Sequence, residues 1–495
     1  MLSAASECAD TRHLSSSHFK GKTERNAMAA HSTITATAAD ALTILPEESV
    51  ISSTGELAIG GCRVSDLAAE YGTPAYILDE VGLRRQIRRF VDGLAAMRPN
   101  SEVLFASKSL PAVAMYSIAA SEGLSIDVAG AGELVMAFSA GVPPDRIYLH
   151  GNAKSDSELQ MAIDAGIRAI VIDNFDDLSR LERLVTGPQH VMLRMIPGIA
   201  PQTHASQSTG GNDSKFGLRP DQLEQAVHRI RSHRHLVLDG VHVHIGSQVL
   251  DTMPFDRAVR SVAELGTFDA YDVGGGLGVR YNSADAAPSV DEYLHTIVRA
   301  AEQLPATARL LIEPGRSIVA RAGVTLYRVN TVKRTGKTFV AIDGGMADNL
   351  DIALTDQRYE AYVATKFDKA PNTLCDVVGR QCESGDLMVA DAALANPEVG
   401  DLVVMPVTGA YAYTMANHYN GALTPPLIVC NQGSSRLAVR RETFDDVLAT
   451  HQPAMDHSSK DGTRPWATSE IEPPASPKTE FTQKQTTSAT DWVRE

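Results

Sequence analysis

Short apolar runs alternate with helix-like stretches from about residue 75 to 320, and this alternation constrains the fold more than any other feature of the chain. Stretches between the runs, such as Asp156–Ala165 and Asp221–Arg231, have helical spacing and plausible caps. Repeated strand-helix units predict a parallel sheet closed into a (β/α)8 TIM-like barrel. The expected strands are Ala75–Leu78, Val103–Ala106, Ile126–Val128, Ile147–Leu149, Ala169–Ile172, Val191–Met195, Leu238–His244, Ala270–Val273 and Leu310–Glu313.

The pattern changes after Arg316 to strands without long helices between them. We therefore expect the barrel at 75–320, a C-terminal β-sandwich or β-barrel domain at 321–450, and a segment at 51–74 that packs on the β domain. Residues 1–50 and 451–495 are rich in small and polar residues with no sustained apolar period, which predicts a disordered leader and a disordered tail. Met28 is an alternative to Met1 as the start of translation.

Composition excludes several classes of function. The net charge is −15 and Lys and Arg form no long cluster, so neither nucleic acid nor an anionic membrane is an expected partner. No window is apolar enough to span a bilayer, and the first fifty residues do not resemble a signal peptide. The five cysteines are odd in number and lack CxxC spacing, which favours a reducing cytoplasm over a disulfide framework or a zinc site.

Several expected strands end in residues that packing does not require. Lys108 ends an apolar run, and it is either a snorkelling lysine or an amine desolvated enough to form a Schiff base with a carbonyl cofactor. The glycines of Gly274–Gly278 let backbone N–H groups approach a phosphate, although they also suit an ordinary turn. Val279 breaks the GxGxxG pattern and argues against a dinucleotide site.

Three further groups carry possible chemistry. His242 and His244 share one face of a strand, which suits a metal site less well than stacking of one imidazole on an aromatic cofactor. Glu313 is either an ion-pair partner of Arg316 or a carboxylate that keeps a pyridine nitrogen protonated. Cys382, beside Glu383 in a polar loop, is either incidental or a proton donor to a carbanion.

Taken together, these segments resemble the alanine-racemase-like (fold type III) pyridoxal-phosphate decarboxylases, and among them the diaminopimelate decarboxylases. The resemblance covers about residues 56–445. The matching motifs are Phe105–Lys108, Asp127–Leu134, His150–Ser155, Ser214–Gly217, His242–Gln248, Gly274–Gly276, Glu313–Arg316, Asp343–Met346, Cys382–Asp386 and Gly409–Tyr411.

The resemblance implies pyridoxal 5'-phosphate as the cofactor and a role for each matching residue. Lys108 would bind the cofactor covalently, His244 would stack on its ring, and Glu313 would face the ring nitrogen. The phosphate and the substrate would be held by Ser247, Gly275, Gly276, Arg316 and Tyr411.

The resemblance also implies an obligate homodimer, because Cys382 and Glu383 would enter the site from the partner subunit. Cys382 would donate the proton that replaces the departing carboxylate, and Glu383 would contact the substrate. No resident metal is expected.

Two stretches depart from the family pattern. The arginine and tyrosine that follow the Asp343–Met346 motif in the family are Asp351 and Thr355 here, with Arg358 as a possible substitute for the arginine, and a further arginine is missing near Ala422. Replacing a cation by an anion reverses an interaction of about 4 kcal/mol at 4 Å and an effective dielectric of about 20.

These observations leave one leading function and three alternatives. The leading function is decarboxylation of meso-diaminopimelate to L-lysine. The alternatives are a decarboxylase of lysine, ornithine, arginine or another biosynthetic amino acid, an inactive cofactor-binding regulatory homologue, and a metal-dependent barrel hydrolase based on His242 and His244.

Overall fold

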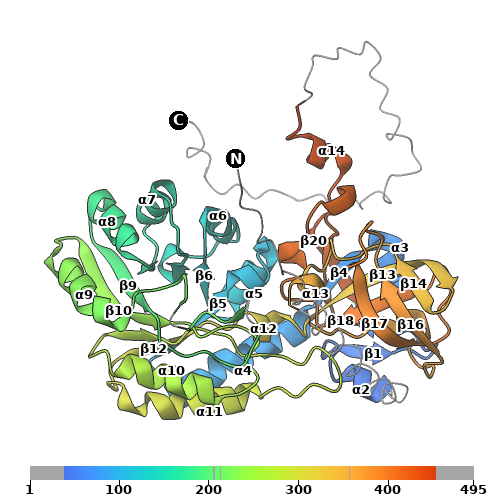
Figure 1. The fold of residues 1–495 in the computed structure, drawn as a ribbon, viewed down its shortest axis with the longest axis horizontal. Coiled ribbons are helices and arrows are strands. Elements are labelled where there is room, and N and C mark those ends of the chain that lie inside the picture. The colour runs from blue at the N-terminus through green and yellow to red at the C-terminus, as the bar shows by residue number, and fades with distance from the viewer. Residues whose placement is uncertain (1–37, 205–206, 212, 356, 453–495) are drawn as a thin grey trace, which may run out of the picture.

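A computed structural model describes residues 38–204, 207–211, 213–355 and 357–452. Eight parallel strands form a closed barrel in the order β5 to β12 (Figure 1). Their bounds are β5 Ser101–Ala106, β6 Ser125–Val128, β7 Ile147–Leu149, β8 Ala169–Ile172, β9 Gln189–Met195, β10 Leu236–Val243, β11 Ala270–Asp272 and β12 Arg309–Ile312. The predicted barrel is therefore confirmed, with β12 pairing β5 to close it.

Helices cover the outside of the barrel because each strand is buried on both faces. They are α4 Glu80–Met97, α5 Val113–Ser121, α6 Ala131–Ser139, α7 Asp156–Ala165, α8 Phe175–Leu184, α9 Leu223–Ser232, α10 Met253–Ala263 and α11 Val290–Ala300. Helix α7 shows how sequence sets the bounds: Ser155 and Glu158 form a capping box, and Gly166 ends the helix in the left-handed region.

The C-terminal domain is a strongly bent sheet built around one long strand, β13, which pairs with β14 through its second half and with β4 and β18 through its first half. Its strands are β4 Ala75–Asp79, β13 Gly323–Arg334, β14 Thr338–Ile342, β15 Tyr362–Val363, β16 Thr373–Val378, β17 Leu387–Leu394, β18 Leu402–Pro406, β19 Leu427–Asn431 and β20 Ser434–Val439. Short helices α13 Asp351–Leu354 and α14 Phe444–Leu448 belong to the same domain.

One predicted barrel strand lies elsewhere. Strand β4 sits in the middle of the C-terminal sheet, antiparallel to β13 and parallel to β19, and it contributes Ile77 to the apolar core of that domain. The expectation that the barrel begins at residue 75 is therefore wrong. The reason is that eight later strands already close the barrel, whereas β4 is buried on both faces only between β13 and β19.

The segment before β4 packs on the β domain, as expected. Strands β1 Ser49–Ile51, β2 Leu57–Ile59 and β3 Cys62–Arg63 form a small antiparallel sheet, followed by helix α3 Val64–Tyr71. Leu57 and Ile59 share a core with Val324 and Ile428 of the larger sheet.

The predicted disordered leader is too long. Helix α2 Ala38–Leu42 precedes the small sheet, and Ala41, Ile44 and Leu45 are fully buried. These side chains bury enough apolar surface to order the backbone from residue 38 onward. The rest of the leader, and the tail from residue 453, lie outside the described residues.

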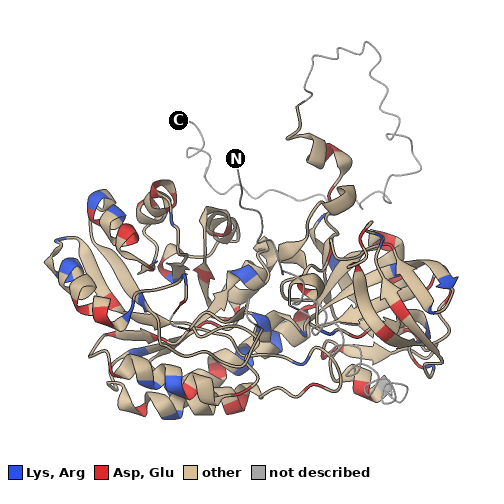
Figure 2. Ribbon diagram, in the orientation of Figure 1, with Lys and Arg blue, Asp and Glu red and all other residues tan. Residues whose placement is uncertain are grey.

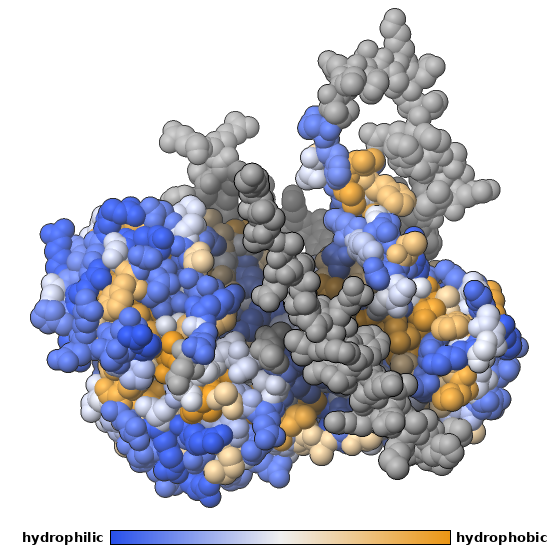
Figure 3. Space-filling model, in the orientation of Figure 1, coloured by the Kyte–Doolittle hydropathy of each residue, from blue (hydrophilic) through white to orange (hydrophobic). Residues whose placement is uncertain are grey.

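Charged residues of both signs are spread over the described part of the chain in the view of Figure 2. Figure 2 shows Lys and Arg interspersed with Asp and Glu over the outer helices and the β domain. In Figure 3 the visible face is mainly hydrophilic, with apolar residues in scattered patches. Among the described residues, every helix is too short or too polar to cross a membrane.

Candidate active site

A cavity of about 310 Å³ opens where the barrel strands end, and Lys108 projects into it. Lys108 lies in a single 3-10 turn, η2 Ser107–Ser109, immediately after β5. Its side chain is exposed to the cavity, whereas Ser107 and Ser109 on either side are buried. Lys108 is therefore positioned by the barrel and is not a snorkelling surface lysine.

The charges around Lys108 keep its amine protonated in the cofactor-free protein. Desolvation deep in the molecule lowers the pKa of Lys108, but the opposite effect of Tyr411, Asp127 and Glu313 is larger, and the pKa is raised overall. The same negative charges would stabilise positive charge on this nitrogen if Lys108 held a carbonyl cofactor.

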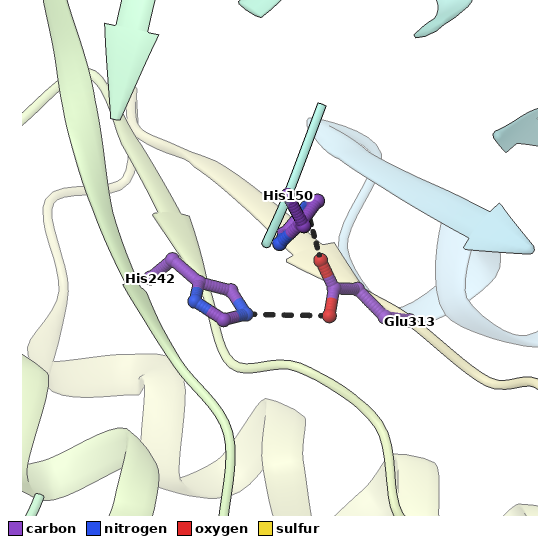
Figure 4. A group of neighbouring side chains, drawn as sticks. All are labelled: His150, His242 and Glu313. Atoms are coloured by element: carbon purple, nitrogen blue, oxygen red, sulfur yellow. Dashed lines mark hydrogen bonds and ion pairs between the residues drawn. The ribbon is translucent and has the colours of Figure 1, made fainter. Parts of the chain in front are cut away.

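Glu313 lies directly after β12, between two buried imidazoles (Figure 4). His242 Nε2, from β10, is 3.2 Å from Glu313 Oε2 in a hydrogen bond. His150 Nε2, after β7, is 3.0 Å from Glu313 Oε1, an ion-pair contact whose direction does not suit a hydrogen bond. Among the described residues, Glu313 Oε1 therefore has no hydrogen-bond donor although it is buried.

The histidines set the charge of this carboxylate. Burial raises the pKa of Glu313, but His150 and His242 lower it more, so the pKa lies well below its usual value. Burial lowers the pKa of His242 to about 4. His150 differs, because Asp127 and Glu313 outweigh the effect of burial and raise its pKa. The cluster thus favours an ionised Glu313, a neutral His242 and positive charge on His150.

The neighbouring imidazole, His244, has a different environment. Its Nδ1 accepts a hydrogen bond of 3.2 Å from the backbone N–H of Gly275, which fixes the ring and places any proton on Nε2. Burial, followed by the charges of Lys108 and Arg194, lowers the pKa of His244 well below 6.5. A neutral, oriented imidazole of this kind can stack on an aromatic ring.

The predicted glycines are required by close backbone contacts. A Cβ at Gly275 would stand 2.0 Å from the carbonyl oxygen of Glu313, and one at Gly276 would stand 2.1 Å from that of Gly246. Gly276 also has a φ of +113°, where other residues are strained. The turn after β11 therefore packs directly against the backbone that follows β10 and β12.

A second cluster, whose residues do not line the cavity, is joined to the neighbourhood of Lys108 through Tyr411 and Ser109. Arg316, in the short helix α12 Arg316–Val319, donates to Ser247 Oγ from Nε and Nη2, both at 3.3 Å, and also to the hydroxyl of Tyr281. Its guanidinium lies 4.5 Å from the ring centre of Tyr411. The backbone of Tyr411 has a φ of +61° and donates to Ser109 O, beside Lys108. Arg316 is buried, and the structure places it with Ser247 and Tyr411 and not with Glu313.

Cys382 and Glu383 are the predicted residues that do not join this site within one chain. Both are exposed in the loop between β16 and β17, and neither lines the cavity. Cys382 is held through its backbone N–H, which donates to Asn420 Oδ1 at 2.7 Å.

Asp351, which replaces a family arginine, is almost fully buried at the start of α13. Its Oδ2 accepts from the Tyr359 hydroxyl at 3.0 Å, and its Oδ1 accepts from Thr355 Oγ1 at 3.1 Å. The ring of Tyr359 packs edge to face against Tyr281, the partner of Arg316. Arg358 is exposed and lies beyond the end of α13, so the helical placement that would let it substitute for the arginine is absent.

Three charged residues of the cavity had been given no role. Asp127, His150 and Arg194 each stand at or just after the end of a barrel strand, as Lys108 and Glu313 do. Burial raises the pKa of Asp127 to about 6, and the guanidinium of Arg194 lies 4.5 Å from the ring centre of Phe216. Position at a strand end was the signal that could have identified them.

The residues present fit pyridoxal phosphate. Buried Glu313 Oε1 lacks a hydrogen-bond donor among the described residues, which a protonated ring nitrogen supplies, and Lys108 projects into the same cavity. The ligand atoms of His150, His242 and Glu313 also lie within 4.8 Å of one another, a spacing that a divalent cation could use. His244, the other histidine of the predicted metal pair, is not in that group.

Comparison with known proteins identifies the family. Residues 82–320 match the family "Pyridoxal-dependent decarboxylase, pyridoxal binding domain". The chain is 42% identical over 411 residues to diaminopimelate decarboxylase of Actinosynnema pretiosum subsp. auranticum, covering 80% of this chain and 92% of the relative. The identity to diaminopimelate decarboxylase of Bacillus subtilis is 39%, over 81% and 96% of the two chains.

Solved structures agree. Diaminopimelate decarboxylase from M. jannaschii, in complex with L-lysine, superposes with a TM-score of 0.76 at 29% identity and covers 83% of this chain and 99% of its own. A lysine/ornithine decarboxylase from Vibrio vulnificus, complexed with putrescine, gives a TM-score of 0.65 at 25% identity, over 74% and 97%. With this fold, this cavity and this extent of identity, the chain belongs to the diaminopimelate decarboxylase family of pyridoxal-phosphate-dependent decarboxylases.

Proposed function

We propose that the protein decarboxylates meso-diaminopimelate to L-lysine and carbon dioxide. The observation that carries this proposal is the pairing of a cavity lysine, Lys108, with an ionised carboxylate, Glu313, whose Oε1 accepts no hydrogen bond among the described residues and is available to a ring nitrogen. The identity to diaminopimelate decarboxylases over about 80% of the chain supports the substrate.

Lys108 and Glu313 would bind the two reactive ends of the cofactor. Pyridoxal phosphate, when bound, supplies an electron sink for the electrons left by the departing carbon dioxide. Lys108 would hold the aldehyde carbon covalently and release it to the substrate amine. Glu313, held ionised by His150 and His242, would keep the ring nitrogen protonated and so maintain that electron sink.

Other residues would orient the bound molecules. His244 would cover one face of the ring, because its own hydrogen bond to Gly275 fixes its plane. Ser247, Gly275 and Gly276 would hold the phosphate, while Arg316 and Tyr411 would contact the phosphate and the substrate. Orientation matters because the bond that breaks must lie perpendicular to the ring plane for its electrons to enter the π system.

The final proton transfer needs a group that the single chain does not supply to the cavity. We propose a homodimer in which Cys382 of one subunit protonates the substrate carbon in the site of the other, with Glu383 in contact with the substrate. The exposure of both side chains and the anchoring of Cys382 by Asn420 support this arrangement. The described cysteines are free thiols, which supports the proposal of a cytoplasmic location.

A second candidate is a decarboxylase that acts on an amino acid with a cationic tail. The observation that favours it is the buried carboxylate of Asp351, which is linked to Arg316 by three contacts that run through Tyr359 and Tyr281. A negative charge there disfavours a distal carboxylate and favours an ammonium group. The Vibrio vulnificus neighbour shows that this fold serves a lysine/ornithine decarboxylase.

The experiment that separates these functions is carbon dioxide release by cofactor-loaded protein from meso-diaminopimelate, L-lysine, L-ornithine and L-arginine in parallel. Preference for diaminopimelate supports the leading proposal, and turnover of only the cationic substrates supports the second. Turnover of none of the four contradicts both and favours the regulatory homologue. Elemental analysis of the same sample checks the hydrolase alternative, which requires a stoichiometric metal.

A further inference from the structure

A second cavity, of about 360 Å³, is lined by Arg280 and Ser317, the chain neighbours of Tyr281 and Arg316. It is bounded by the segment that links α2 to β1, by α4, by the loop after β11 and by α12 with the residues that follow it. Helices α4 and α12 are in contact, near the junction of the barrel with the β domain (Figure 1). Its volume is sufficient for a small organic molecule.

Three arginines line this cavity: Arg89, Arg280 and Arg321. Glu47 forms ion pairs with two of them. Arg89 Nη1 lies 2.6 Å from Glu47 Oε1, and Arg321 Nη1 lies 3.7 Å from the same oxygen. Asp291, the other acidic residue of the lining, is exposed at the start of α11. The arginines are close enough to affect one another, since burial and then the charges of Arg89 and Arg280 lower the pKa of Arg321 in spite of Glu47.

Two polar atoms of the lining have hydrogen-bonding capacity that the protein does not use. Ser317 is only 7% exposed, and its Oγ has no hydrogen-bond partner among the described residues. Arg280 donates from Nη2 to Ser283 O, but its buried Nε has no partner in the same set of residues. A buried hydroxyl or guanidinium N–H that stays unpaired costs about 1–3 kcal/mol, so a ligand that pairs with it gains that free energy.

We propose that this cavity is a regulatory site for a small anion that carries a phosphate group or several carboxylates. The guanidiniums supply the charge for such a ligand, while Ser317 Oγ and Arg280 Nε supply unused hydrogen bonds. Planar guanidinium groups favour phosphate and carboxylate over other anions.

The site is connected to the active site by the peptide backbone. Arg316 donates a hydrogen bond to the hydroxyl of Tyr281. Arg280 directly precedes Tyr281 and Ser317 directly follows Arg316, so each residue with an unused donor is the chain neighbour of one partner in that bond. A ligand that draws Arg280 and Ser317 toward itself would therefore move both ends of the contact that holds Arg316. This coupling rests on the proposed role of Arg316 at the cofactor phosphate, whereas the binding itself does not.

The test is titration of the full chain, loaded with pyridoxal phosphate, with inorganic phosphate and with citrate, followed by calorimetry and by thermal unfolding. Loading fills the cofactor's own phosphate site. We expect saturable binding of at least one anion, weakened about tenfold in Arg280→Gln and about threefold in Ser317→Ala, because each variant removes one hydrogen bond to a charged ligand. Ser317→Ala is a mild change that keeps the fold, since it deletes an unpaired buried hydroxyl.

The matched control is Arg334→Gln, which removes an exposed arginine from the β domain. Binding of citrate alone identifies a carboxylate ligand, and binding of phosphate alone identifies a phosphate ligand. The proposal is overturned if neither anion binds the loaded protein, or if Arg280→Gln and Ser317→Ala bind as tightly as the control. Calorimetry does not depend on turnover, so an inactive enzyme that binds the anion would contradict the proposed function and leave this site standing.

Discussion

His150 Nε2 lies 3.0 Å from Oε1 of Glu313, and both side chains are buried at the end of the barrel. Asp127 Oδ1 is 3.8 Å from the same nitrogen, so one imidazole lies within ion-pair distance of two carboxylates. This pair is the electrostatic centre of the site, because it keeps Glu313 ionised without exposing it to water.

The pair makes stability depend on pH in a defined direction. The folded pKa of Glu313 lies below 4.5, so its contribution is present above pH 4.5 and is lost as the pH falls through the lower folded value. The folded pKa of His150 is raised above 6.5, so its contribution is complete below pH 6.5 and is lost as the pH rises through the raised value. Between pH 4.5 and 6.5, the unfolding free energy of cofactor-free Glu313→Gln should be about 3 kcal/mol lower than that of the cofactor-free wild type.

The measurement is denaturant unfolding of both cofactor-free proteins across the pH range. The deficit of Glu313→Gln should shrink as the pH rises above 6.5. Glu302→Gln, at an exposed position, is the control and should show little deficit at any pH. A deficit that does not vary with pH would contradict the ion pair.

Lys108 should be the residue that carries the cofactor. Borohydride reduction of the loaded protein, followed by peptide mass spectrometry, should find the cofactor mass on Lys108. Lys154 is the internal control, since it lines the same cavity but its Nζ is 2.6 Å from Asp177 Oδ2. Lys108→Ala should lose the label and the activity together; label on Lys154 would refute the assignment.

Cys382 and Lys108 should act in the same site from different subunits. Cys382→Ala should lower the rate of decarboxylation about 10²-fold to 10⁴-fold, the usual contribution of a proton donor. Co-expression of Cys382→Ala with Lys108→Ala should restore about one quarter of the wild-type activity, because half of the dimers are mixed and each mixed dimer has one intact site. Absence of recovery in purified mixed dimers would show that the two residues serve the same subunit's site.

Gly275→Ala should destabilise the fold and not only the site. The added Cβ would meet Glu313 O at 2.0 Å, a backbone atom that cannot move without shifting β12. We expect a loss of about 3 kcal/mol or more, measured by denaturant unfolding without cofactor. Gly336→Ala is the matched control, since nothing lies within 4 Å of its Cβ position, and it should unfold like the wild type.

Asp351→Asn should reveal whether the buried charge selects the substrate. Both oxygens of Asp351 are already hydrogen-bonded within the protein, so we expect the ratio of kcat/KM for meso-diaminopimelate over L-lysine to change by less than about threefold. Stability should fall by about 1 kcal/mol as the bond from Tyr359 loses its charge. A rise of about tenfold or more in that ratio would instead support the candidate with a cationic-tailed substrate.

The sequence by itself determined the barrel and much of the site. The periodic runs located all eight barrel strands, and helical spacing with plausible caps located α7 at Asp156–Ala165. Lys108, Glu313 and the glycine turn were recognisable because charged residues and glycines at strand ends oppose the local apolar pattern. Each of these signals lies within a short stretch of the sequence, and local physical chemistry is sufficient to interpret it.

The tertiary structure decided what depends on distant segments. Strand β4 has the same apolar pattern as a barrel strand, and only its pairing with β13 and β19 assigns it to the β domain. Ala41 and Leu45 order the end of the leader only because a remote core covers them. The ion pair of His150 with Glu313 forms only when the ends of β7 and β12 meet in the folded barrel. The burial of Asp351, with its hydrogen bond from Tyr359, likewise exists only in the folded protein. Burial and through-space charge set these properties, and neither quantity is written in a local pattern.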